Sequence, residues 1–151
     1  MVKKKLQESS FLVTINPNIS VEPDSESQYE LEGRIRDFID DVFSEPNFMD
    51  GDSPPMLTLP DNYEFGDIER VAIDKSIEHG SKRGFLHCHM LVEIKRRCGS
   101  LKLNLKYIRE RGQQEFGHKI HLDGKALRSG AEQKENVRKY IKKGEKPSLY
   151  G

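Results

Sequence analysis

The chain has 151 residues, of which 34% are hydrophobic and 33% are charged, enough for one domain with a modest core and a heavily solvated surface. No apolar run is as long as a membrane span, and the N-terminus has no signal-peptide segment, so we expect no membrane partner. Cys88 and Cys98 are too few for a disulfide framework, which favours a reducing, intracellular compartment.

Charge is unevenly divided along the chain, although the formal net charge is zero. Residues 1–80 contain 7 Lys and Arg and 18 Asp and Glu, whereas residues 81–151 contain 18 Lys and Arg and 7 Asp and Glu. This asymmetry has two interpretations: a basic face that binds a polyanion, or two halves that attract each other within one fold.

The first half of the chain predicts a strand, a helix and a loop, in that order. Residues 11–16 are rich in strand-forming residues and are followed by the turn signal Pro17-Asn18. Apolar residues at helical spacing predict an amphipathic helix over 30–44, which Pro46 ends. Residues 45–66 contain Pro, Gly and Asp, and predict a long acidic loop insertion with one short extended piece at 56–59. Loops of this length are usually functional or disordered, so we expect a lid, a partner site or a disordered segment.

The second half predicts a hairpin, a helix, a short strand and a last helix. Strands at 68–77 and 85–94 flank a glycine-bracketed turn at 79–84. A helix is expected at about 103–115, a short strand at 118–124 and a basic helix at 131–143. The order β-α-β-β-α-β-α predicts an α+β fold with a central antiparallel sheet and helices on one face, in a single domain spanning 1–151.

The segment 85–94 carries the clearest chemical signal. Alternation in a strand places its apolar residues on one face and His87 and His89 side by side on the other. Two imidazoles on the non-core face of a rigid strand predict a metal site, although two ligands leave the choice among Zn, Mn, Fe, Co and Ni open. Glu78 and His79 compete as the third ligand, because hairpin register cannot be read from sequence.

Two weaker signals lie in other segments. Tyr140 and Lys143 share a face of the last predicted helix, where a phenol beside a cation could act as a nucleophile. The same tyrosine, next to Val137 and Ile141, also fits the edge of a core. In the first strand, Thr14 and Asn16 share a polar face that could hydrogen-bond a ligand.

Taken together, three segments resemble the nuclease domain of the HUH endonuclease superfamily, and in particular the replication-associated (Rep) proteins of eukaryotic single-stranded DNA viruses. Phe11-Leu-Val-Thr-Ile-Asn-Pro17 is similar to the first family motif, and Gly84-Phe-Leu-His-Cys-His-Met-Leu-Val-Glu93 to the second, His-hydrophobic-His motif. Asn136-Val-Arg-Lys-Tyr-Ile-Lys-Lys-Gly144 is similar to the third, Tyr-x-x-Lys. The motifs stand in the family's order and span residues 11–144. The acidic insertion at 45–66 is longer than the resemblance predicts.

The resemblance implies a ferredoxin-like or RRM-like HUH fold and a metal-dependent enzyme that nicks and joins single-stranded DNA to initiate rolling-circle replication. Glu78, His87 and His89 would hold Mg²⁺ or Mn²⁺, and Tyr140 would form a 5′-phosphotyrosine with help from Lys143. The expected DNA contacts are Thr14, Asn16, Lys82, Arg83 and Lys139. The expected partners are a single-stranded DNA origin, in a stem-loop, and a helicase domain of a longer protein. A viral Rep would act in the host nucleus.

Three other functions remain open at this point. A single-tyrosine HUH transposase would share the chemistry. A non-catalytic nucleic-acid-binding module would need exposed aromatic residues on its sheet, for which Phe11 and Phe85 are available. A zinc-stabilised adaptor would use Cys88 and Cys98, but strand alternation turns Cys88 away from His87 and His89.

Overall fold

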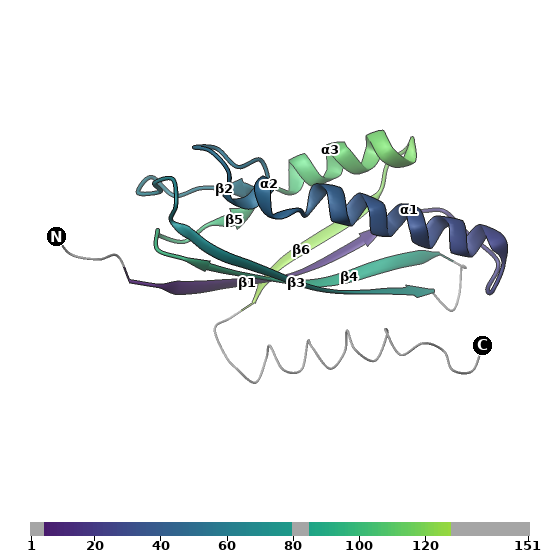
Figure 1. Ribbon diagram of the computed structural model, residues 1–151. Coiled ribbons are helices and arrows are strands. Elements are labelled where there is room, and N and C mark those ends of the chain that lie inside the picture. Colours follow the sequence, from purple (N-terminus) through teal and green to yellow (C-terminus); the bar gives the residue numbers. More distant parts are fainter. Residues whose placement is uncertain (1–4, 80–84, 128–151) are drawn as a thin grey trace.

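The computed structural model describes residues 5–79 and 85–127 (Figure 1). The predicted helix at 131–143 and residues 80–84 of the predicted turn lie outside these ranges.

A four-stranded antiparallel sheet forms the floor of the fold. Its strands are β1 (Gln7–Asn16), β3 (Ile68–His79), β4 (Leu86–Arg96) and β6 (His121–Leu127), and their order across the sheet is β3-β4-β1-β6. β1 pairs antiparallel with both β4 and β6, and β3 pairs antiparallel with β4. The predicted hairpin of the second and third long strands is therefore present.

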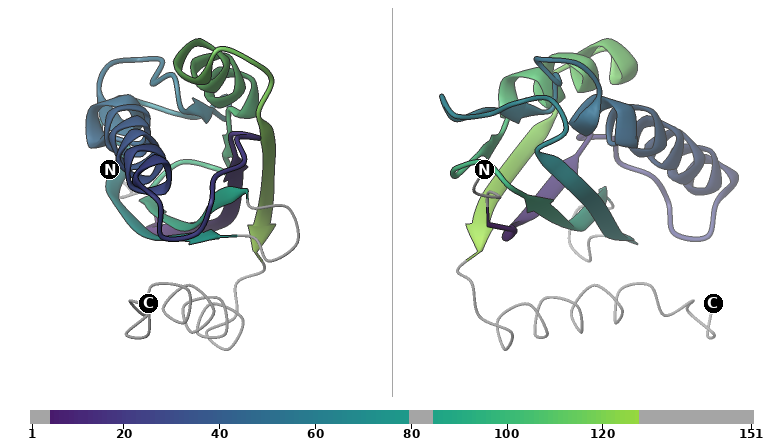
Figure 2. Two further views of the ribbon diagram at one scale, coloured as in Figure 1. Left: turned by 90° about the vertical axis from the view of Figure 1, so that its right-hand side faces the viewer. Right: turned by 60° about the vertical axis from the view of Figure 1, so that its left-hand side comes forward.

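Two helices, α1 (Glu26–Val42) and α3 (Leu105–Phe116), cover one face of this sheet (Figures 1 and 2). Ser25 caps α1 by accepting a hydrogen bond from the backbone N–H of Gln28, and Asn104 caps α3 in the same way. α3 ends at Gly117, whose φ of 78° is the left-handed conformation typical of a helix C-cap. None of the helices in the described ranges is long and apolar enough to cross a membrane.

The fold class predicted from the sequence is confirmed. The chain order β1-α1-β3-β4-α3-β6 is the ferredoxin-like β-α-β-β-α-β arrangement, an α+β fold with an antiparallel sheet and helices on one side. The core lies between the sheet and the helices. It is formed by alternate residues of the central strands and by the apolar stripe of α1, among them Val13, Ile15, Met90, Val92, Ile35 and Val42.

The predicted acidic loop at 45–66 is more structured than its composition indicates. It contains a short helix, α2 (Glu45–Met49), and a two-residue strand, β2 (Leu57–Thr58), which pairs with β5 (Lys102–Leu103). Phe48 and Met56 are fully buried in the core. Such burial anchors the segment to the helical layer, so the expectation of a disordered loop is wrong.

Element boundaries also differ from the predicted ones. β1 begins at Gln7 rather than at residue 11, and α1 begins at Glu26 rather than at residue 30. In both cases the extra residues are polar and carry no apolar periodicity. The buried side chain of Arg96 explains the first difference, because its guanidinium donates hydrogen bonds to Ser9 Oγ (2.7 Å) and Gln7 Oε1 (3.1 Å) and so ties the polar start of β1 to the end of β4.

Candidate metal centre

The two histidines of β4 lie on the face of the sheet opposite α1 and α3, called here the outer face. Their neighbours in the strand, Leu86, Cys88 and Met90, are buried in the core. The alternation predicted for this strand is therefore present at the histidines. Leu91 departs from the simple pattern, since it is on the outer face by parity but is fully buried.

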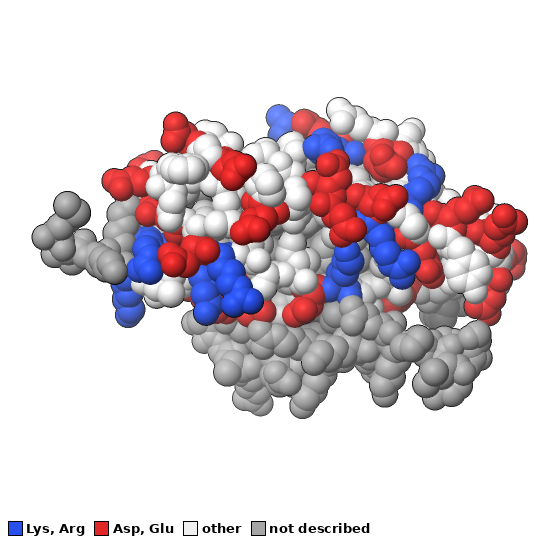
Figure 3. Space-filling view, viewed as in Figure 1, with Lys and Arg blue, Asp and Glu red and all other residues white. Residues whose placement is uncertain are grey.

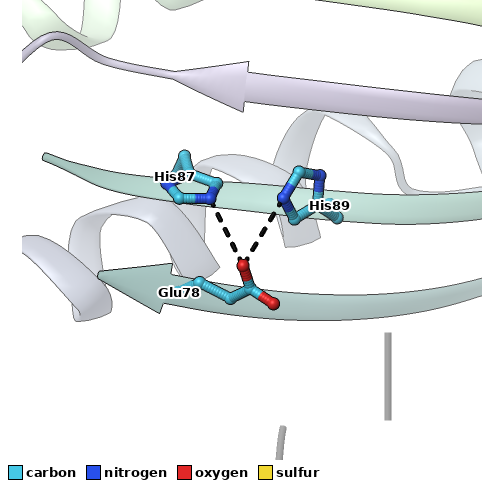
Figure 4. Close-up of side chains that lie close together, drawn as sticks. All are labelled: Glu78, His87 and His89. Carbon is cyan, nitrogen blue, oxygen red and sulfur yellow. Dashed lines mark ion pairs between the residues drawn. The ribbon is translucent and has the colours of Figure 1, made fainter. Parts of the chain in front are cut away.

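The register of the β3–β4 hairpin brings Glu78 beside both histidines (Figure 4). Glu78 pairs with His87, and its Oε2 atom lies 3.4 Å from His87 Nε2 and 3.6 Å from His89 Nε2. One potential ligand atom from each residue lies within 4.8 Å of the other two. The described residues thus include a His/His/Glu group that could hold a metal ion, as the sequence predicts.

His79, the competing third ligand, points to the other face. It pairs with the core residue Leu86, and its Nε2 atom lies 2.9 Å from the carbonyl oxygen of Val21. Adjacent residues of a strand point to opposite faces, so Glu78 and His79 cannot both reach the histidine pair. The structure therefore brings Glu78, and not His79, to the histidine pair.

The surroundings of His89 favour its neutral form by lowering its pKa. Burial lowers the pKa of His89 below its ordinary value of 6.5, the neighbouring His87 lowers it further, and the carboxylate of Glu78 acts in the opposite direction. The two imidazole rings meet edge to face, with their centroids 4.8 Å apart. Because a metal binds the neutral imidazole, a histidine with a lowered pKa is ready to coordinate at neutral pH.

The donor set could hold a divalent cation. Atoms that each lie about 2.1 Å from one ion are about 3 to 3.5 Å apart from one another, close to the two contacts of Glu78. Two imidazole nitrogens and one carboxylate leave coordination positions open for water or an oxygen of a substrate. The side chains of Glu78 and His87 are 25% and 22% exposed, so the group is accessible from the outer face.

Thr14, predicted as a DNA contact, lies beside the His/His/Glu group. It pairs with His89 across the β1–β4 ladder, and its Oγ1 atom lies 3.0 Å from His89 Nδ1. Strand alternation predicts a polar face for Thr14 but does not predict this contact. Strand parity was the only available signal, because the pairing of β1 with β4 joins residues 75 positions apart.

Asn16, the second predicted contact of this strand, has a structural role in the turn after β1. Its Oδ1 atom accepts a hydrogen bond of 2.8 Å from the backbone N–H of Asn18, whose φ is 60°. This arrangement is an Asx turn, in which the side chain replaces a backbone acceptor.

The cysteines take no part in the metal centre. Cys88 and Cys98 are not joined in a disulfide, both are buried and packed in the core, and Cys88 points away from His87 and His89. The geometry therefore opposes a zinc-stabilised adaptor that would combine Cys88 with the histidines.

Charged side chains continue along the outer face beyond the metal centre. A shallow pocket of about 250 Å³ is lined by Glu8, Arg70, Ala72, Glu93 and Lys95. On the other side of the molecule, acidic side chains gather over α1 (Figure 3). Five predicted site residues, Lys82, Arg83, Lys139, Tyr140 and Lys143, lie outside the described residues.

Comparisons with known proteins add little to this geometry. No family model and no curated protein sequence matches the chain. One solved structure is similar, that of the hypothetical protein ORF119 from Sulfolobus islandicus rod-shaped virus 1, with 15% sequence identity and a TM-score of 0.48. The match covers 92% of this chain and 84% of that one. A similarity at this level carries no argument about activity.

Proposed function

We propose that the protein is a metal-dependent endonuclease that nicks and rejoins single-stranded DNA through a 5′-phosphotyrosine at Tyr140, in the manner of a Rep initiator of rolling-circle replication. The observation that carries the proposal is the group formed by Glu78, His87 and His89 on the accessible outer face of the sheet. A carboxylate and two imidazoles with open positions suit an ion that must also bind a phosphate oxygen.

The proposed reaction is a phosphoryl transfer. The phenol oxygen of Tyr140 forms a bond to phosphorus as the bond between phosphorus and the leaving 3′-oxygen breaks. The phenol loses its proton, and the leaving 3′-oxygen gains a proton to become a 3′-hydroxyl. A bound Mg²⁺ or Mn²⁺ would act as a Lewis acid on the phosphate oxygens. The ammonium of Lys143 would favour the phenolate, whose ordinary pKa is near 10. The phosphotyrosine conserves the phosphodiester bond, so a free 3′-hydroxyl can reverse the step and rejoin the strands.

The outer face offers a path for the rest of the DNA strand. Arg70 and Lys95 line the pocket further along β3 and β4, beside the carboxylates of Glu8 and Glu93. Lys95 is six residues beyond His89, about 20 Å along a strand, which corresponds to a few nucleotides of extended DNA. Lys82, Arg83 and Lys139 would add phosphate contacts, and binding should weaken as salt concentration rises.

A non-catalytic nucleic-acid-binding module is supported less well. Such a module stacks bases on exposed aromatic residues of its sheet. Phe11, one of the two available aromatics, is buried in the core, and Phe85 is only partly exposed beside its bridge to Ser20. The metal group also has no role in that function. A transposase of the same superfamily would share the proposed chemistry and differ only in its DNA.

A covalent-adduct assay tests the proposal. The 151-residue chain is incubated with stem-loop DNA that carries a randomised single-stranded loop and a 3′-terminal fluorophore, with Mn²⁺ or with EDTA. The 5′-phosphotyrosine retains the labelled 3′ fragment, so we expect a labelled protein band on a denaturing gel, only with Mn²⁺. Tyr140→Phe should abolish the band. Tyr29→Phe is the matched control and should keep it, because Tyr29 is an exposed tyrosine of α1 on the other side of the fold.

Each other outcome counts against a stated part of the proposal. An adduct that persists in Tyr140→Phe would move the nucleophile to another side chain. DNA binding that is independent of metal, with no cleavage of any sequence in the pool, would favour the binding module and overturn the nuclease.

A further inference from the structure

The imidazole of His89 has two nitrogens, and the structure gives them different partners. Nε2 faces Glu78 Oε2 at 3.6 Å, within the metal group, whereas Nδ1 lies 3.0 Å from the hydroxyl oxygen of Thr14. Coordination through Nε2 requires a lone pair on that atom, so the single proton of the neutral ring must then be on Nδ1. This N–H group is part-buried and needs an acceptor, and the hydroxyl oxygen of Thr14 is placed to provide one.

We propose that Thr14 is a positioning residue of the metal centre. When a cation is bound by Nε2, the Nδ1–H group of His89 donates its hydrogen bond to Thr14 Oγ1. This hydrogen bond holds the ring in the orientation that turns Nε2 toward Glu78 and His87. It also makes Nε2 a better electron-pair donor to the cation. The inference rests on the proposed metal-dependent function, because it describes how the same site is held.

A hydroxyl suits this position because it can both donate and accept. In the metal-free protein the carboxylate of Glu78 favours a proton on Nε2 of His89, and the Thr14 hydroxyl can then donate to Nδ1. When a cation displaces that proton, the hydroxyl rotates and accepts instead. Thr14 can therefore satisfy His89 in both states without a movement of the strands.

The position of Thr14 in the sheet gives the contact its rigidity. β1 lies between β4 and β6, so Thr14 is held by ladders on both sides, opposite His89 and Asp123. A β-branched side chain in a central strand also has few accessible rotamers. A partner fixed in this way can orient a metal ligand more precisely than a loop residue could.

Ser76 provides an internal comparison on the opposite side of His89. It is the β3 partner of His89 and carries a hydroxyl in the same row of the sheet, yet its Oγ atom has no hydrogen-bond partner among the described residues. Ser76→Ala therefore removes a neighbouring hydroxyl without removing a bond to the histidine. It is the matched control for Thr14→Val.

The test is a calorimetric titration of the 151-residue chain with MnCl₂. Thr14→Val keeps the volume and branching of the side chain but lacks an acceptor, so we expect its dissociation constant to rise about 10–100-fold. Thr14→Ser should restore the wild-type value, and Ser76→Ala should leave it unchanged. Equal affinities in wild type and Thr14→Val would overturn the role of Thr14 while leaving the proposed nuclease intact. A wild-type chain that binds no Mn²⁺ would overturn both.

A spectroscopic measurement separates positioning from simple packing. In the Zn²⁺-loaded, ¹⁵N-labelled protein, we expect a slowly exchanging Nδ1–H signal of His89 in wild type and Thr14→Ser. In Thr14→Val the same proton should exchange rapidly with water, because it has lost its acceptor. A protected Nδ1–H signal in Thr14→Val would assign the acceptor to another group and contradict the proposal.

Discussion

Glu78 lies directly opposite His87 in the β3–β4 ladder, and its Oε2 atom is within 3.6 Å of the Nε2 atoms of both His87 and His89. A slip of one residue in this register would replace the carboxylate by the imidazole of His79. The pairing of two strands therefore gives the site its combination of two histidines and one carboxylate, and places the acidic ligand on the accessible side of the sheet.

Substitution of Glu78 should weaken metal binding far more than substitution of its neighbour. Glu78→Gln replaces a charged ligand with a neutral amide of the same size. Loss of a residue that only hydrogen-bonds a metal ligand lowers affinity roughly 10–100-fold, and we expect Glu78→Gln to lower the Mn²⁺ affinity by more than this. His79→Ala removes a contact with the carbonyl of Val21, on the face away from the histidine pair, and should leave the affinity unchanged. Electron paramagnetic resonance of free Mn²⁺ measures both, and the reverse order of effects would reassign the third ligand.

The pH dependence of the metal-free protein should show a lowered pKa at His89. Burial and the proximity of His87 lower that pKa below 6.5, so the unfolded state binds more protons than the folded state near this pH. The free energy of unfolding should consequently rise with pH in this range. The stability that neutral His89 contributes is lost as pH falls from 6.5 through the folded-state pKa. NMR titration of the ring gives the pKa directly. Glu78→Gln should lower it further, since the carboxylate raises it; a value at or above 6.5 in wild type would contradict this environment.

Gly112 should not tolerate a side chain. A Cβ atom at this position in α3 would collide with Cδ1 of Ile120 and lie 3.2 Å from its Cγ1 atom. We expect Gly112→Ala to lower the free energy of unfolding by about 1–3 kcal/mol, the usual cost of overpacking a core. Gly33→Ala is the control in α1, where a Cβ would meet nothing within 4 Å. Gly33→Ala should raise the free energy of unfolding by about 0.5–1 kcal/mol, because alanine favours the helix more than glycine does. Urea denaturation compares the two variants, and equal effects would show that Ile120 does not restrict Gly112.

Replacement of Arg96 by lysine should destabilise the fold. Its buried guanidinium donates to Ser9 Oγ, to Gln7 Oε1 and to the carbonyl oxygen of Cys98, the last at 2.6 Å. A lysine ammonium cannot reproduce this fork, so Arg96→Lys should cost about 1–3 kcal/mol of stability. Arg97→Lys, at a more exposed ion pair with Glu69, should cost less than about 1 kcal/mol. Thermal or urea unfolding that finds no difference between the two would refute the structural role of Arg96.

The sequence predicts the elements whose residues repeat with a clear period. The apolar stripe of α1 and the alternation of β4 identify the helix, the strand and the face that carries His87 and His89. It does not predict β1 from Gln7 onward, because that segment is stabilised by the distant Arg96 rather than by its own apolar residues. It also fails for the segment 45–66, where proline, glycine and aspartate conceal the buried anchors Phe48 and Met56.

The sequence predicts those parts of the candidate site that depend only on the pattern of residues within one strand. Alternation alone places both histidines on one face, but the choice between Glu78 and His79 depends on hairpin register, which only the folded structure defines. The contact of Thr14 with His89 depends on the pairing of strands far apart in the chain. Sequence reasoning could therefore find Thr14 on a polar face but could not assign its partner.

The most direct test of the account is a calorimetric titration of the 151-residue chain with Mn²⁺, beside the double variant His87→Ala/His89→Ala. The account predicts one Mn²⁺ per wild-type chain and no binding to the double variant at the same concentrations. A wild-type chain that takes up no Mn²⁺, or a double variant that binds it equally well, would contradict the assignment of the metal centre to Glu78, His87 and His89.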